Sequence, residues 1–350
     1  MSKNKSQLTF DELNEFDELD KYEYYAERFN PLRTDRQARR KRQPKPDHKP
    51  KKNQQEIIAA VAEPTGVEGT FTTTYTPARY EAEWLLASVR PFYDDEIISD
   101  VLAQVKGGKE ASVYCCKAHP VTGGDLFAAK VYRPRRFRNL RNDALYRQGR
   151  TTLTDDGRPV KTTDHRIARA VGKKTDFGVQ VQHTSWLMHE YTTLQQLHKV
   201  GAAVPQPIAA GENAILMSYH GDAQMAAPTL NSVSLALSEA RRLFQETLRN
   251  IELMLQHGLI HGDLSAYNIL YWEGEITLID FPQVINIFTN NQAHFILQRD
   301  LTRVCEYFAR QGVACDPKAI MADLWRRYAE TNPNRLADDS RRVMDEEEAT

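Results

Sequence analysis

Two stretches of this 350-residue sequence decide its interpretation: His261-Gly262-Asp263-Leu264-Ser265-Ala266-Tyr267-Asn268 and Leu278-Ile279-Asp280-Phe281. They place an Asn five residues after one Asp, and a second Asp seventeen residues after that first Asp. Phosphoryl transfer from a metal-bound nucleotide uses such a set. One carboxylate accepts or orients the proton of the acceptor, while an amide and a second carboxylate hold Mg²⁺ against the phosphates. We therefore predict Asp263 as the catalytic base and Asn268 and Asp280 as magnesium ligands.

A lysine and a glutamate form a second predicted pair. Lys130 follows the apolar run 126–129 in a predicted strand, where a buried lysine needs an anionic partner or a phosphate. On the helix predicted over 183–200, positions 187, 190, 194 and 197 share one face, and Glu190 is the one that is not Leu. A carboxylate on an apolar stripe is costly unless it is paired. We expect Glu190 to fix the Lys130 ammonium against the α- and β-phosphates.

Two backbone segments are further candidates for contact with the nucleotide. The paired glycines Gly107 and Gly108, with Lys109, lie in a turn whose amides could approach phosphate oxygens. The spacing matches neither Gly-x-Gly-x-x-Gly nor a Walker motif, and a plain hairpin turn explains the glycines equally well. A predicted buried strand ends in a hinge whose backbone could bond an adenine edge. The predicted hinge residues are Met217, Ser218 and His220.

Charge is unevenly distributed along the chain, although the net charge is only −1. Residues 33–52 carry ten Lys or Arg and two Asp, and this basic block could contact RNA or a ribosome through its phosphates. A flexible, solubilising arm is an equally supported alternative. No apolar run is long enough to cross a bilayer, and the four cysteines lack the spacing of a zinc motif. We expect a cytoplasmic protein without a membrane partner.

The order of apolar segments predicts an α+β fold with two lobes, an N-lobe built on an antiparallel sheet and a short helical C-lobe. Strands are expected over 112–116, 126–132, 214–219 and 276–279, and helices over 183–200, 234–257, 293–310 and 317–330. Short helices are expected between residues 80 and 105. The predicted segments are 1–65 (charged, disordered arm), 66–95 (helical lead-in), 96–217 (N-lobe, with a flexible Arg-rich insertion at 133–182), 218–335 (C-lobe) and 336–350 (acidic tail).

Together these segments resemble the RIO family of atypical protein kinases, over about residues 95 to 315. The resemblance is carried by Gly108-Lys109-Glu110-Ala111 with Val113-Tyr114, Ala129-Lys130-Val131-Tyr132, His189-Glu190-Tyr191, Val204-Pro205-Gln206-Pro207, His261 to Asn268, Ile279-Asp280 with Gln283, and Arg299-Asp300. Ordinary eukaryotic-like kinases have Lys where Ser265 stands, and they need a longer lobe after the metal-binding Asp. Only seventy residues follow Asp280 here.

The resemblance implies a phosphotransferase that uses ATP and Mg²⁺ and transfers the γ-phosphate to Ser or Thr of a protein, or to itself. It implies the same roles for Lys130, Asp263, Asn268 and Asp280, with the hinge at adenine. RIO proteins act in maturation of the small ribosomal subunit in eukaryotes and archaea. This chain looks more like a bacterial member, whose substrate the resemblance does not supply.

Two departures from related kinases have consequences. The family's Ser-Thr-Gly-Lys-Glu loop is Lys106-Gly107-Gly108-Lys109-Glu110 here, so hydroxyl contacts to phosphate are lost. Pro282 stands where most kinases have a Gly that permits the metal-binding Asp to flip, and proline cannot adopt that backbone. We therefore predict that Asp280 does not flip.

Three alternatives remain open. The first is a RIO-type ATPase switch, phosphorylated on the metal-binding Asp. The second is a small-molecule phosphotransferase of the aminoglycoside or choline kinase type, which also uses His-Gly-Asp with an Asn five residues after the Asp. Those proteins generally need a larger C-terminal lobe. The third is a non-catalytic, nucleotide-gated binding module of ribosome or RNA assembly, which the full set of polar residues disfavours.

Overall fold

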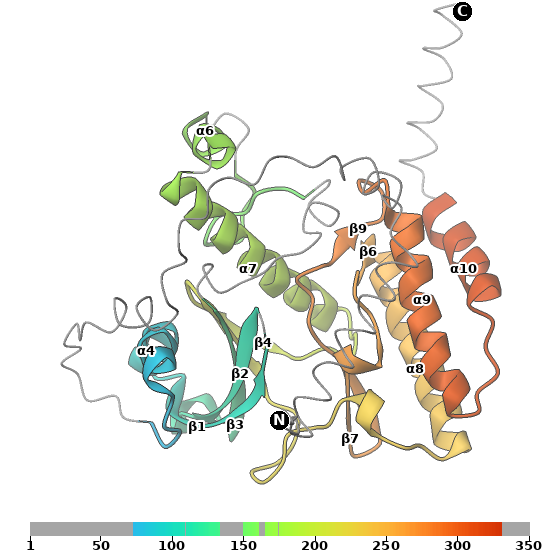
Figure 1. The fold of residues 1–350 in the computed structure, drawn as a ribbon, viewed down its shortest axis with the longest axis horizontal. Coiled ribbons are helices and arrows are strands. Elements are labelled where there is room, and N and C mark those ends of the chain that lie inside the picture. Colours follow the sequence, from blue (N-terminus) through green and yellow to red (C-terminus); the bar gives the residue numbers. More distant parts are fainter. Residues whose placement is uncertain (1–72, 109, 134–149, 161–164, 174, 331–350) are drawn as a thin grey trace, which may run out of the picture. The chain divides into compact units, whose positions relative to one another are not determined.

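The computed structural model describes residues 73–108, 110–133, 150–160, 165–173 and 175–330. The predicted arm 1–65, with its basic block, and the acidic tail 336–350 lie outside the described residues, as do Lys109 and much of the insertion. The structure confirms the predicted α+β class, since an antiparallel sheet is followed along the chain by a group of helices (Figure 1).

The N-lobe is a five-stranded antiparallel sheet with the strand order β1-β2-β3-β5-β4. Its strands are β1 (Ile98–Gly107), β2 (Ala111–Ala118), β3 (Leu126–Tyr132), β4 (Pro207–Ala210) and β5 (Ala214–Ser218). Helix α4 (Arg79–Asp94) packs on one face, because Leu85, Val89 and Phe92 share an apolar cluster with Val131. Helix α7 (Asp176–Lys199) contacts the sheet through a second cluster.

Alternation along β3 decides which side chains meet α7. Phe127, Ala129 and Val131 join the cluster beneath α4, whereas Ala128 and Tyr132 join the cluster that contains Leu187 and Leu197 of α7. Successive side chains of a strand point to opposite faces. Position 130, which lies between Ala129 and Val131, is therefore directed to the side of α7.

The expectation of short helices between residues 80 and 105 is half wrong. Helix α4 is present, but Ile98 begins a ten-residue strand. Ile98 and Val101 are both fully buried in the cluster with α4, three residues apart, which is the spacing of a helical face. The register shift between Ile98 and Asp100 turns the side chains of Ile98 and Val101 to the same face of the strand. A bulged strand thus imitated a helical pattern.

Among the described residues, the C-lobe contains three α-helices and two pairs of short antiparallel strands. The helices are α8 (Leu237–Gln256), α9 (Ala293–Arg310) and α10 (Pro317–Trp325), which ends in a π-helical turn at Arg326–Glu330. The strand pairs are β6 (Leu259–Ile260) with β9 (Ile285–Asn286), and β7 (Ile269–Trp272) with β8 (Glu275–Leu278). Single 3₁₀ turns lie at Pro120–Thr122, Leu230–Ser232 and Ala266–Asn268. The predicted C-lobe helices are thereby confirmed.

Within the predicted insertion, the structure describes helix α6 (His165–Lys173) and the segment 150–160. Helix α7 begins at Asp176, seven residues before the predicted start, because Thr175 caps its N-terminus by accepting a hydrogen bond from the Gly178 N–H. Among the described residues, none of the helices has the length and apolar character needed to cross a membrane.

Candidate active site

A short hairpin brings the two predicted metal ligands together. Strands β7 and β8 pair with Ile269 opposite Leu278, so the residues just before β7 and just after β8 become neighbours. The Ile279 N–H donates a hydrogen bond to the carbonyl oxygen of Asn268 at 2.9 Å. Asn268 and Asp280, twelve residues apart in sequence, therefore lie at the same end of one hairpin.

The predicted Lys130–Glu190 pair is present, and Asp280 completes it. The Lys130 Nζ atom lies 2.6 Å from Glu190 Oε1 and 2.6 Å from Asp280 Oδ1. Burial disfavours the ammonium, but the Asp280 and Glu190 carboxylates outweigh it and raise the pKa of Lys130 above its ordinary value. Burial likewise acts to raise the pKa of Asp280, while the Lys130 ammonium overcomes that effect and lowers it. The Lys130 ammonium and the Asp280 carboxylate are therefore both ionised at neutral pH.

Glu190 is held by two further donors that sequence reasoning missed. The Tyr132 hydroxyl donates to Glu190 Oε2, and the Phe281 N–H donates to Glu190 Oε1 at 3.3 Å. Tyr132 follows Lys130 by two residues on β3, so both side chains lie on the same face of the sheet. The two-residue spacing could therefore have predicted from sequence that Tyr132 lies beside Lys130. The Phe281 contact depends on folding over ninety residues of sequence and was not readable.

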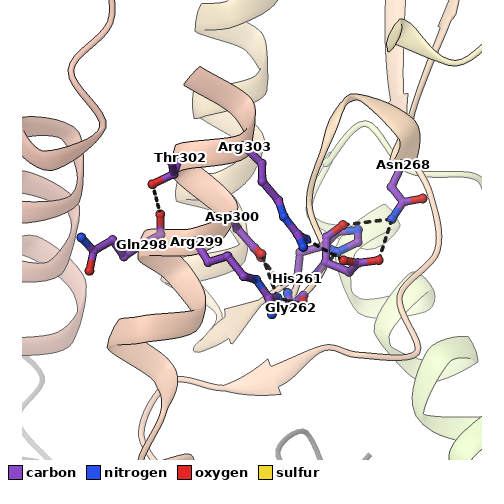
Figure 2. A network of polar contacts seen from close by, with 9 residues as sticks. His261, Gly262, Asn268, Gln298, Arg299, Asp300, Thr302 and Arg303 are labelled. Atoms are coloured by element: carbon purple, nitrogen blue, oxygen red, sulfur yellow. Dashed lines mark hydrogen bonds and ion pairs between the residues drawn. The ribbon is translucent and has the colours of Figure 1, made fainter. Parts of the chain in front are cut away.

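Asp263 is fixed by a cation from a different part of the chain. Arg303 Nη1 of α9 lies 2.7 Å from Asp263 Oδ1, and the Asn268 side-chain amide donates to Asp263 Oδ2 at 3.3 Å (Figure 2). Burial raises the pKa of Asp263, although Arg303 and Arg299 oppose the shift. The predicted catalytic carboxylate is therefore oriented through both of its oxygens.

The backbone of the predicted catalytic loop, His261 to Asn268, is also anchored to α9. The Gly262 N–H donates to Asp300 Oδ2 at 2.8 Å, and the Arg299 guanidinium donates to the Gly262 carbonyl (Figure 2). Arg303 lies one helical turn beyond Arg299, and residues four apart share a helix face. The residues that carry the family resemblance include Arg299 and Asp300 but not Arg303. The four-residue spacing from Arg299 could have identified Arg303 from the sequence.

The phosphate loop and the hinge receive weaker support. A Cβ added at Gly108 would lie 2.7 Å from the Ala111 carbonyl, so this position excludes a side chain, whereas Gly107 has room for one. The Ser218 N–H donates to Gln206, and the His220 carbonyl accepts from Ala227. Contact with a base would thus fall to other backbone groups of Ser218 and His220. These roles stay predictions, as does that of the buried Met217.

The donor set fits magnesium bound together with a nucleotide. Among the residues with described positions, no group of three or more His, Cys, Asp or Glu side chains is arranged to hold a metal. Asp280 and Asn268 supply one carboxylate and one amide. Mg²⁺ typically uses one or two carboxylates and completes its shell with water and substrate phosphates, so a sparse set of oxygen donors is what such an ion requires.

The sheet, the Lys130–Glu190 pair and the Asp263–Asn268–Asp280 set together define a protein of the kinase-like class. A family model described as the RIO domain matches residues 127–320, more than half of the chain. The chain therefore belongs to the RIO-domain family, and the predicted resemblance is confirmed.

Curated relatives of the chain are named serine/threonine-protein kinases. The chain is 28% identical over 237 residues to RIO-type serine/threonine-protein kinase Rio1 of Haloferax volcanii, covering 67% of this chain and 72% of that protein. It is 31% identical over 228 residues to serine/threonine-protein kinase RIO1 of Chaetomium thermophilum, covering 62% of this chain. That match spans only 41% of the fungal protein, and a match to human RIO1 spans 35% of the human protein.

Among solved structures, the chain is similar to the Rio2 kinase–ADP/Mg²⁺–phosphoaspartate complex from Chaetomium thermophilum. The sequence identity is 17% and the TM-score is 0.46, with 85% of this chain and 86% of that chain covered.

Gly262 offers a test of the loop geometry. Gly262 and Gly201 both have left-handed backbones (φ 85° and 78°), but a Cβ at Gly262 would overlap the Gln283 carbonyl, while one at Gly201 meets open space. Each Ala substitution should lower the free energy of unfolding by about 1–2 kcal/mol through backbone strain. Gly262→Ala alone should also displace the catalytic loop. Urea unfolding should therefore show a larger loss for Gly262→Ala. Equal losses would mean that the close approach to Gln283 is not a constraint.

Proposed function

We propose that this chain is an ATP- and Mg²⁺-dependent phosphotransferase, a RIO-type serine/threonine protein kinase that transfers the γ-phosphate of ATP to a protein or to itself. The observation that carries the proposal is the Lys130 ammonium, 2.6 Å from both Glu190 and Asp280. A lysine held between two carboxylates, one of which is also the predicted magnesium ligand, is the arrangement that protein kinases use at the phosphates. Family membership supports the same activity.

Each residue has a role that follows from its position. Lys130 holds the α- and β-phosphates, and Glu190 fixes the direction of its side chain. Asp280 and Asn268 would hold Mg²⁺, which neutralises phosphate charge when it is bound. The Asp263 carboxylate accepts or orients the proton of the acceptor hydroxyl. Arg303 holds that carboxylate in place, since a half-buried carboxylate without a cation would protonate or turn away.

A RIO-type ATPase switch is the second candidate. The Asp280 side chain is 43% exposed despite its ion pair, so its carboxylate is accessible enough to act as a phosphoryl acceptor. The two candidates differ in their product, because an acyl phosphate on Asp hydrolyses readily and a phosphate ester of Ser or Thr survives acid. A small-molecule phosphotransferase receives no support from the family match.

The location and the partners of the protein are also proposals. We propose that the protein acts in the cytoplasm. Contact of residues 33–52 with RNA or a ribosome is proposed from their charge alone.

Asp263→Asn tests the catalytic role. The variant keeps the shape of the side chain but cannot accept a proton, so kcat should fall by about 10²–10⁴-fold. Affinity for ADP with Mg²⁺ should persist. The assay is incubation with ATP labelled at the γ-phosphate, followed by acid and base treatment of the labelled protein. Labelled product at the wild-type rate would refute the assignment of Asp263.

Asp280→Asn tests the metal position. Loss of one charged contact is worth about 1.5–3 kcal/mol, so the affinity for ADP with Mg²⁺ should fall roughly 10- to 150-fold. Binding of ADP in the presence of EDTA should change much less. Calorimetric titrations of both proteins under both conditions provide the comparison. An unaltered response to Mg²⁺ would exclude Asp280 as a ligand.

Arg303→Met tests the support of Asp263 from α9. Without the cation the half-buried carboxylate loses its orientation, and kcat should fall by about 10²-fold, with little change in the KM for ATP. Arg310→Met, at the exposed end of the same helix, is the matched control and should leave both constants unchanged. Steady-state kinetics decide the point. A rise in KM at constant kcat would assign Arg303 to nucleotide binding instead.

A further inference from the structure

A short segment of the insertion, residues 150–160, is used by none of the roles above. It folds back on itself, with a β-bridge between Leu153 and Pro159 and hydrogen bonds from Thr154 N–H to the Arg158 carbonyl and from Val160 N–H to the Thr152 carbonyl, both 2.8 Å. We call residues 150–160 the strap. Its first residue, Arg150, contacts the chain that follows Asp280, and Thr151 and Leu153 contact helix α7.

The body of the strap is attached to α7. The Leu153 N–H donates to Ser185 Oγ at 2.9 Å, and His189 Nε2 lies 2.6 Å from the Thr151 carbonyl oxygen. The Leu153 side chain is buried in the cluster that contains Leu187. His189 immediately precedes Glu190. The strap is therefore fixed to the stretch of helix that carries the carboxylate partner of Lys130.

Arg150, the first residue of the strap, contacts the segment of chain that follows Asp280. Arg150 Nη2 donates to the Pro282 carbonyl at 2.6 Å and to the Val284 carbonyl at 2.7 Å. These two carbonyls belong to the chain that leaves Asp280. Asp280 itself has φ 72°, a left-handed conformation that costs roughly 1–3 kcal/mol for a residue with a side chain and persists only where its surroundings impose it.

The strap connects the two structural elements that meet at Lys130. Glu190 lies on α7, and Asp280 lies at the end of the β7–β8 hairpin, yet both carboxylates bond the same Nζ atom. The Phe281 N–H provides one direct connection between them, through Glu190 Oε1. The Arg150 side chain provides a second connection, because it bonds the carbonyls two and four residues after Asp280.

We propose that Arg150 is a positioning residue that holds the segment after Asp280, and through it the Asp280 carboxylate, in the geometry that binds the metal–nucleotide complex. The inference rests on the proposed function of Asp280 as a magnesium ligand. Arg150 touches backbone carbonyls only, so its effect on the metal passes through the path of the chain. Both hydrogen bonds come from the same nitrogen, Nη2, whose two N–H groups can each reach one carbonyl oxygen.

Arg150→Gln is the test variant, and Arg158→Gln is its matched control. Arg158 lies in the same strap, but its side chain is 84% exposed and pairs only with the neighbouring Asp156 among the described contacts. The measured quantity is the ratio of two dissociation constants, that for ADP in EDTA to that for ADP with Mg²⁺, from calorimetry on the full chain. Thermal melting of each variant reports stability separately.

In Arg150→Gln the ratio should fall by about 10- to 100-fold, the usual effect of losing a group that orients a metal ligand. Binding of ADP in EDTA should stay close to wild type, and Arg158→Gln should match wild type in both. Arg150→Lys, which keeps the positive charge but carries its donors on a shorter side chain, should give an intermediate ratio.

Three outcomes would count against the inference. An unchanged ratio in Arg150→Gln would remove the role of Arg150. Equal weakening of both dissociation constants, with a lower melting temperature, would reduce the strap to a stabilising element. A wild-type protein in which Mg²⁺ does not strengthen ADP binding would instead refute the proposed function itself. The same titrations therefore separate failure of the strap inference from failure of the magnesium assignment.

Discussion

The structure depends on one buried ammonium. Lys130 comes from a central strand, and a lysine withdrawn from water at that position is unfavourable unless negative charge reaches it. Glu190 and Asp280 supply that charge from elements 60 and 150 residues further along the chain, each at 2.6 Å. The pairing therefore fixes the sheet, α7 and the β7–β8 hairpin relative to one another. The stability of this arrangement and its proposed chemistry have the same origin, since the ammonium that needs these carboxylates is also the cation that we propose contacts a phosphate.

Around Asp263, too, one structural element makes several of the positioning contacts. Helix α9 holds the loop through Gly262 by both the backbone N–H and the carbonyl, and holds the carboxylate through Arg303. Backbone and side chain are thus positioned by one rigid element. A catalytic group held in this way keeps its orientation when the surrounding loops move, which is the requirement for efficient proton transfer.

Residues that are close in sequence could be predicted, and so could those that violate a pattern. Asp263, Asn268 and Asp280 lie within one hairpin and its loop, so their spacing alone brought them together. Glu190 was recognisable because it interrupts a stripe of leucines. Arg150 was not recognisable, because it lies 132 residues from its carbonyl partner and backbone acceptors leave no mark on the sequence. Strand β1 was missed because its bulges space Ile98 and Val101 as a helix would.

The dependence of the catalytic loop on α9 has a consequence for the order in which the protein can mature during synthesis. The segments that form the sheet, α7 and the Lys130–Glu190 pair are all synthesised before residues 299–303. Asp263 is made forty residues before its partner Arg303. A nascent chain can therefore form the Lys130–Glu190 pair before the Asp263 carboxylate gains its cation, so the two predicted parts of the site mature one after the other.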